Sequence, residues 1–259
     1  MNARCHGRHA WAGVPTPPDA SAAYPPARWK AAWIWSAGPA GGKHDYVYFR
    51  REFELADVPE RVLLRLAADR DASLWMNGAL IAHGPAISDP HFKRYDTHDV
   101  TAHLSAGVNC VAVRVYHDTT CGAFTDQAAA HGLLCQVEDG ERIITATDET
   151  WRAQACRAYL KPGARLGDSM WPEIFDARRD TPGWRDVGFD DRAWPAASRV
   201  IAPVHSLWHE EQPQARFFPW VNLIPSETRP LRRVRRRPAA LHAVGEVLQR
   251  REPTSGDVA

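Results

Sequence analysis

Short stretches of alternating apolar and polar residues recur from residue 27 to about residue 180. The clearest is "GVNCVAVRVYH", where Val111, Val113 and Val115 fall on one side of an extended chain. Similar runs are "DYVYFRREFEL", "RVLLRLAAD", "HGLLCQVE" and "RIITATDETWRAQ". No helical period extends over about ten residues. The pattern therefore predicts an all-β fold, a β-sandwich of the jelly-roll type.

One segment, "ADRDASLWMNGALIAHGP", predicts a tight hairpin within this sandwich. Asn77 and Gly78 both tolerate a positive φ, as a two-residue type I′ turn requires. This turn would place Leu74 opposite Ile81, with apolar groups on both faces of the hairpin. Pro85 follows a Gly and is expected to lie just beyond the end of the second strand.

Composition divides the chain into three parts. Residues 1–28 are rich in Pro and Ala and show no period, so we expect a flexible leader. Residues 29–202 carry the strand pattern and are expected to form the sandwich. Residues 203–259 are rich in Pro and Arg, including "RPLRRVRRRP", and predict a connector to a downstream domain that this chain lacks.

Charge and hydrophobicity exclude several classes of protein. The net charge is +1 and charged residues make up 24%, which is typical of a soluble globular protein without a membrane partner. No apolar run reaches the ~18 residues of a membrane span. No signal peptide is visible, and the five cysteines form no CxxC. We therefore expect a cytoplasmic protein with reduced thiols.

The sequence offers little evidence for catalysis. It contains no GxSxG, no HExxH, no phosphate-binding glycine motif and no paired zinc-ligand spacing. Carboxylates are numerous, but no spacing distinguishes the pair that glycoside hydrolysis needs. We therefore expect no catalytic residue, no metal and no cofactor, and no activity of this chain alone.

An ordered set of motifs resembles a known family: "AWIWS", "YFRREFEL", "AADRDASLWMNGALIAHGP", "YDTHDVTAHLSAGVNCVAVRVYH", "PEIFDAR" and "GWRDVGFDDRAW". Together they resemble the N-terminal, non-catalytic β-sandwich module of bacterial α-L-rhamnosidases and related glycoside hydrolases. The resemblance implies a galactose-binding-like jelly roll that assists recognition of L-rhamnose-containing glycans. The family's catalytic helical barrel has no match here, which implies a truncated chain. Some members bind calcium with rhamnose, but no such ligand set matches here.

Candidate sugar contacts follow from residue chemistry. Sugar sites combine flat aromatic faces with a few fixed polar groups, often on loops at strand ends. The chain has 11 Trp residues, each of which could instead fill the core, just as each acid could cap a turn. The candidate carbohydrate-binding residues are Tyr95, Asp96, Trp171, Glu173, Asp176, Arg178 and Trp184.

Two other functions fit the same sequence. A purely structural module would pack against the catalytic domain, for instance through Phe217, Phe218 and Trp220. A basic-tail interaction protein would bind a polyanion through the arginines of residues 229–237. No aromatic residue is interleaved there to stack on bases, so nucleic acid is the less favoured partner.

Overall fold

A computed structural model describes residues 27–37, 45–68, 70–86, 88, 93–117, 131–160, 172–200, 223–227 and 240. The chain divides into two units, residues 1–229 and 230–259, and every element below belongs to the first. Its elements are β1 (Ile34–Ser36), β2 (Asp45–Leu55), β3 (Leu63–Ala68), β4 (Asp71–Met76), β5 (Ala79–Gly84), β6 (Lys93–Asp99), η2 (Thr101–His103), β7 (Gly107–His117), β8 (Leu133–Asp139), β9 (Arg142–Ala146), β10 (Arg152–Ala155), β11 (Tyr159–Leu160), β12 (Ile174–Phe175), η3 (Ala177–Arg179), β13 (Ala197–Arg199) and β14 (Leu223–Pro225).

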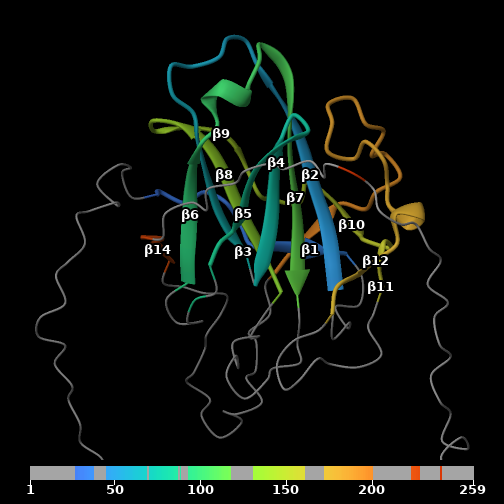
Figure 1. Ribbon diagram of the computed structural model, residues 1–259. Coiled ribbons are helices and arrows are strands. Elements are labelled where there is room, and N and C mark those ends of the chain that lie inside the picture. The colour runs from blue at the N-terminus through green and yellow to red at the C-terminus, as the bar shows by residue number, and fades with distance from the viewer. Residues whose placement is uncertain are drawn as a thin grey trace, which may run out of the picture. The chain divides into compact units, whose positions relative to one another are not determined.

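The strands form two sheets that pack face to face (Figure 1). The seven-stranded sheet has the order β13-β1-β8-β3-β6-β14, with β9 paired to β8. The five-stranded sheet has the order β10-β2-β7-β4-β5, and β11 and β12 form a separate ribbon. The predicted all-β, jelly-roll sandwich is confirmed.

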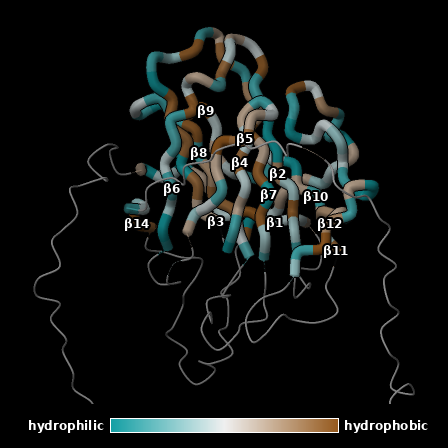
Figure 2. Tube along the Cα trace, in the orientation of Figure 1, coloured by the Kyte–Doolittle hydropathy of each residue, from teal (hydrophilic) through white to brown (hydrophobic). Residues whose placement is uncertain are grey.

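The core lies between the two sheets because side chains alternate along each strand. Val111, Val113 and Val115 of β7 point into it, as their spacing predicts, and meet Leu64 and Leu66 of β3. Figure 2 shows apolar residues recurring along the central strands. The intervening residues of β7 point to the outer face of the five-stranded sheet, which is where the functional argument below begins.

The predicted hairpin joins β4 to β5. Asn77 and Gly78 have φ angles of 50° and 76°, which confirms the turn. The expected pairing of Leu74 with Ile81 is wrong: the register shifts next to Leu74, which pairs with Ala82. A bulge of this kind adds one residue to a strand and increases its local twist. Gly84 ends β5, and Pro85 lies beyond it as expected.

Both ends of the described sandwich converge on Tyr95 of β6. The backbone N–H of Ala27 donates to the Tyr95 hydroxyl at 3.1 Å, and the N–H of Ser226 donates to the Tyr95 carbonyl at 2.8 Å. β14 adds a parallel strand beside β6, so part of the predicted connector belongs to the sheet. Residues 1–26, 217–220 and 229–237 lie outside the described residues.

The thiols of the described residues are free. Cys110 and Cys135 are buried in strands, and burial raises the pKa of Cys110 to about 11. Cys5 and Cys121 lie outside the described residues. Among the described residues, no helix is long and apolar enough to cross a membrane. The same residues contain no group of three or more His, Cys, Asp or Glu side chains that could hold a metal ion.

Acid should weaken the sandwich through His131, which precedes β8. Its ring lies 5.1 Å from Trp35 and 5.4 Å from His117, and burial, followed by the charge of His117, lowers the pKa of His131 to about 4. The unfolded chain takes up the same proton near pH 6.5. The free energy of unfolding should therefore fall as pH drops from about 6.5 to about 4, by about 1–2 kcal/mol after allowing for partial exposure.

Urea unfolding at a series of pH values measures this contribution. The His131→Gln variant should lose less stability than the wild type across the same window. Equal losses in the two proteins would contradict the assignment.

Candidate functional site

One half of the outer face of the five-stranded sheet, called the covered half, lies under a tryptophan-rich segment. The other half, called the open half, is covered only in part, by Tyr159 of β11 stacked on Tyr46. Residues 180–196, here called the tryptophan loop, lie over the covered half. Trp184 stacks on Tyr48 of β2 at 4.1 Å and meets Trp75 of β4 edge-on at 5.4 Å. Trp194 and Phe189 complete this second apolar cluster.

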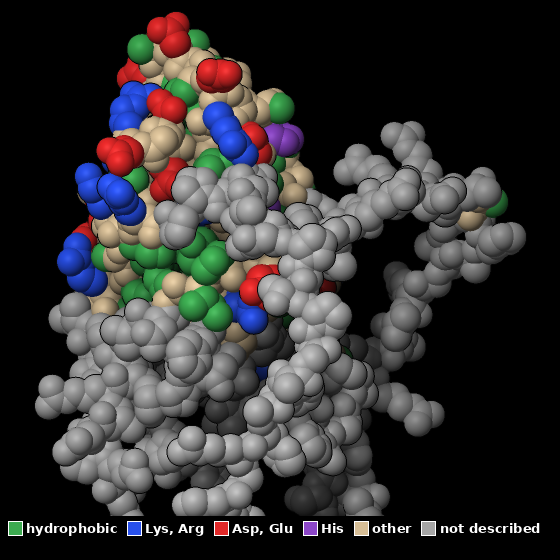
Figure 3. Space-filling model, turned by 90° about the vertical axis from the view of Figure 1, so that its left-hand side faces the viewer, with side chains coloured by type: hydrophobic (Ala, Val, Ile, Leu, Met, Phe, Trp, Pro, Cys, Tyr) green, Lys and Arg blue, Asp and Glu red, His purple; other side chains and the backbone are tan. Residues whose placement is uncertain are grey.

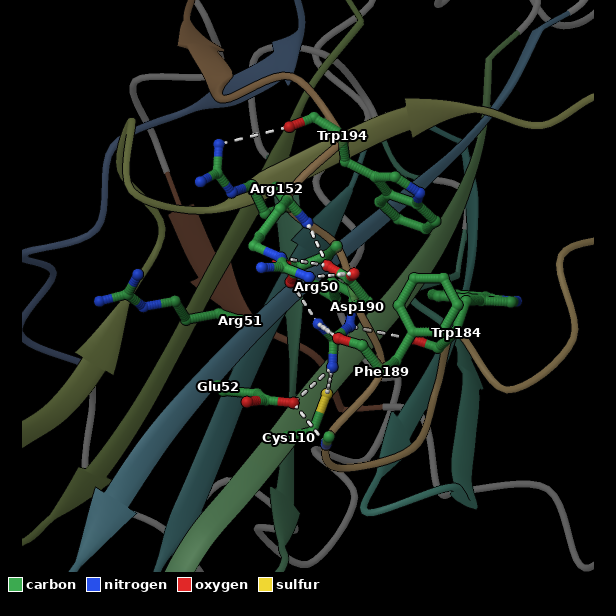
Figure 4. Close-up of polar contacts among 12 residues, drawn as sticks. Arg50, Arg51, Glu52, Cys110, Arg152, Trp184, Phe189, Asp190 and Trp194 are labelled. Atoms are coloured by element: carbon green, nitrogen blue, oxygen red, sulfur yellow. Dashed lines mark hydrogen bonds and ion pairs between the residues drawn. The ribbon is translucent and has the colours of Figure 1, made fainter.

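Arg50 of β2 holds the tryptophan loop in place. Its side chain is 1% exposed, and its guanidinium donates to backbone carbonyls of that loop at 3.0–3.2 Å: Trp184, Asp186 and Phe189. It also forms ion pairs with Glu52, at 2.7 Å, and with Asp191 (Figure 4). A buried guanidinium needs such complete pairing, so the loop's path depends on Arg50.

The open half begins at Arg114, the cross-strand partner of Tyr48. A polar row crosses three strands there: His83 of β5 pairs with Ser73 of β4, and Ser73 pairs with Arg114 of β7. Arg114 in turn pairs with Tyr48, which marks the boundary with the covered half. These side chains share one face because cross-strand partners point the same way.

A ladder of aromatic rings runs beside the polar row. Successive ring centroids are separated by 4.7, 3.9 and 5.0 Å, in the order Tyr116, Tyr46, Tyr159 and Phe175. The Arg114 guanidinium lies 4.8 Å from the centre of the Tyr159 ring and donates to its hydroxyl. Phe175, the last ring, is 46% exposed. The ladder therefore ends in an apolar surface that solvent reaches.

Two carboxylates lie near these rings. Burial, followed by the charge of Glu173, raises the pKa of Tyr46 to about 12, and Asp71 adds to this shift. Asp71 is exposed as a residue, but burial of its carboxyl group raises the pKa of that group, and the charges of Arg114 and His83 oppose the change. The Arg114 site is defined by these residues: Asp71, Ser73, His83, Arg114, Glu173 and Phe175. It offers hydrogen-bond acceptors, a cationic donor and an exposed ring.

The structure places the predicted sugar contacts in separate regions. Tyr95 is buried on the outer face of the seven-stranded sheet, edge-on to Trp29 at 5.2 Å. The carboxylate of Asp96 lies beside Gly84 and forms a hydrogen bond with Ser226, and burial raises the pKa of Asp96. Neither residue belongs to the Arg114 site. Trp184 is 2% exposed within the covered half, so its ring is already used in packing.

Three other predicted contacts, Glu173, Asp176 and Arg178, lie next to β12 or in η3. Glu173 is exposed and belongs to the Arg114 site, whereas Trp171 is outside the described residues. Asp176 caps η3 by accepting from the backbone N–H of Arg178, and it also accepts from the Arg178 guanidinium at 2.8 Å. That hydrogen bond lowers the pKa of Asp176. A role in sugar contact stays a prediction for all seven residues.

Sequence reasoning missed five members of the Arg114 site: Asp71, Ser73, His83, Arg114 and Phe175. Asp71 and Ser73 follow from the strand pattern, because a period of two places them on the outer face with Trp75. His83 reaches that face only through the bulge beside Leu74, which the turn does not predict. The alternation along β7 also places Arg114 on the outer face. It does not show whether that arginine contributes to a binding site or only faces solvent. Phe175 is two residues from Glu173, and its exposure could not be derived from composition.

Comparison with known proteins identifies the family. The model of the α-L-rhamnosidase N-terminal domain matches residues 89–218, about half of the chain. The chain belongs to this family. It is an N-terminal domain of the α-L-rhamnosidase-like glycoside hydrolases, as the motifs predict.

The relatives of this rhamnosidase domain are much longer. The α-L-rhamnosidase of Streptomyces avermitilis is 31% identical over 187 residues, which cover 64% of this chain and 17% of that protein. A GH78 rhamnosidase of Bacillus sp. GL1 superposes with a TM-score of 0.65 at 26% identity, covering 77% of this chain and 20% of that one. The α-L-rhamnosidase of Dictyoglumus thermophilum shares the fold, with a TM-score of 0.53 at 22% identity over 67% of this chain and 21% of its own. The chain thus spans about a fifth of these proteins.

Replacing Arg50 with Met should release the tryptophan loop. The loss leaves two acidic side chains and several carbonyls without their buried donor, so we expect unfolding to become easier by about 3–5 kcal/mol. Arg51 is the matched control, since its guanidinium donates only to the Thr150 carbonyl among the described contacts. Arg51→Met should cost about 1 kcal/mol or less. Urea unfolding followed by tryptophan fluorescence measures both variants, and similar losses would contradict the role of Arg50.

Proposed function

We propose that this domain binds carbohydrate at the Arg114 site, as the non-catalytic recognition module of an α-L-rhamnosidase-like glycoside hydrolase. The observation that carries this proposal is a ladder of rings that contacts Arg114, lies near two carboxylates and ends in the exposed ring of Phe175, on the half of the sheet that the tryptophan loop leaves open. Catalysis would belong to the part of the longer relatives that this chain does not span.

The chemistry of a neutral sugar fits this arrangement. One face of a pyranose ring carries mainly C–H groups and packs against an aromatic ring. Its hydroxyls donate to carboxylates such as Glu173 and Asp71 and accept from a guanidinium such as Arg114. L-Rhamnose has a methyl group in place of a hydroxymethyl group, which enlarges its apolar surface. A rhamnose-containing glycan is therefore the ligand we propose.

A second candidate function is docking against a neighbouring domain. Figure 3 shows hydrophobic side chains gathered among charged ones on the side of the molecule that carries β6 and β14. Partly buried apolar residues on the outer face of the seven-stranded sheet support this reading: Ala27, Trp29, Ala31 and Leu223. This surface is distinct from the Arg114 site, so the two functions can be tested separately.

Replacing Phe175 with Ala should weaken sugar binding without unfolding the domain. Loss of a ring contact worth about 1 kcal/mol predicts a roughly five-fold weaker affinity. Val187 is the control, because it is similarly exposed but lies on the tryptophan loop. Calorimetric titration with L-rhamnose and with a rhamnose-containing oligosaccharide measures the affinity, with D-glucose as the comparison sugar.

The wild type and Val187→Ala should bind alike, and both more tightly than Phe175→Ala. Equal affinity in all three proteins would place the sugar elsewhere. A wild-type chain that melts cooperatively but binds no sugar would contradict the proposal and favour the docking function.

A further inference from the structure

The polar row of the Arg114 site has a fixed hydrogen-bond polarity. The Ser73 Oγ lies 3.0 Å from Arg114 Nη2 and 2.9 Å from His83 Nδ1. A guanidinium only donates, so Ser73 accepts from Arg114. Ser73 is 0% exposed, and its own proton needs an acceptor inside the protein. The nitrogen Nδ1 of His83 is that acceptor, so the neutral imidazole carries its proton on Nε2.

We propose that His83 and Ser73 are positioning residues that orient Arg114 for carbohydrate, and that protonation of His83 weakens sugar binding. This inference rests on the proposed function for its ligand. The relay itself, from Arg114 through Ser73 to His83, rests only on the geometry of the three side chains.

Protonation of His83 reverses one step of the relay. The new Nδ1–H can only donate, so Ser73 would accept from both neighbours and its hydroxyl proton would lose its acceptor. A buried hydroxyl without a partner is costly. The imidazolium and the guanidinium, 2.9 Å and 3.0 Å from the same Ser73 oxygen, also repel each other, so the hydrogen bond from Arg114 to Ser73 is weakened. Arg114 keeps its contact with Tyr159 but is held less firmly from the other side.

Charged groups around His83 come from several elements. Asp71 of β4 interacts with both His83 and Arg114, and Glu173 lies within electrostatic reach of Asp71. Asp96 of β6 lies beside Gly84, the residue after His83. These carboxylates attract a charged imidazole, whereas Arg114 repels it. The carboxylates offset part of the repulsion between protonated His83 and Arg114, but they do not give the Ser73 hydroxyl an acceptor at His83 Nδ1.

Two measurements test the proposal. The first is ¹⁵N NMR of the full chain without sugar, which reports the His83 tautomer and the Arg114 Nε–H signal during a pH titration. We expect the Nε2–H tautomer at about pH 8 and a shift of the Arg114 signal as the pH is lowered and His83 becomes protonated. An Nδ1–H tautomer, or an Arg114 signal that ignores the titration, would overturn the relay.

The second measurement is L-rhamnose affinity at about pH 8 and about pH 5. Wild-type affinity should fall roughly five-fold or more at the lower pH, the effect of one buried hydroxyl losing its partner. His83→Asn keeps a side-chain acceptor near the Nδ1 position and stays neutral, so its affinity should be the same at both values. His103→Asn removes an exposed histidine of η2 and should retain the wild-type response. Ser73→Ala should bind weakly at both pH values.

A pH response that persists in His83→Asn would overturn the proposal. If the wild type binds no rhamnose at either pH, both the proposed function and the sugar-linked part of this inference fail. The NMR titration then still decides whether the relay exists, so the two failures are distinguishable.

Discussion

Arg50 places a full positive charge beneath the tryptophan loop, with the Phe189 ring over its guanidinium, and this burial constrains the five-stranded sheet. A guanidinium has five N–H donors in a rigid fork, and inside a protein nearly all of them need acceptors. The strand that carries Arg50 cannot supply all of these acceptors. The tryptophan loop supplies backbone carbonyls and Asp191, so it must follow one path across the sheet.

That path determines which part of the sheet stays available for a ligand. Tyr48 lies at the boundary, with Trp184 stacked on its ring and Asp180 accepting from its hydroxyl at 2.7 Å. Arg114, the cross-strand partner of Tyr48, is the first residue of the open half. Buried ion pairs contribute little net stability against apolar alternatives, but they can specify one arrangement over others. In this domain Arg50 specifies the position of the loop, and the loop delimits the Arg114 site.

The sequence predicts those features that depend on local periodicity. The alternation around Val113 identifies the core face of β7, and Asn77-Gly78 identifies the hairpin turn, because both are encoded within a few residues. The bulge near Ile81 depends on sheet twist and has no local signal. The role of Trp184 also escapes prediction, since residue type does not reveal whether a ring packs on a sheet or faces a ligand. Among the predicted contacts, Glu173 joins the Arg114 site, whereas Tyr95 joins the two ends of the sandwich.

The most direct test of this account is to map L-rhamnose onto the isotopically labelled chain by changes in amide chemical shift. We predict saturable shifts confined to the open half, at residues of β5, β7, β11 and β12 around His83, Arg114, Tyr159 and Phe175, with little change in the tryptophan loop. Shifts centred on Tyr95 and Asp96, or no shifts in a folded chain, would contradict the claim that the open half of the five-stranded sheet binds carbohydrate.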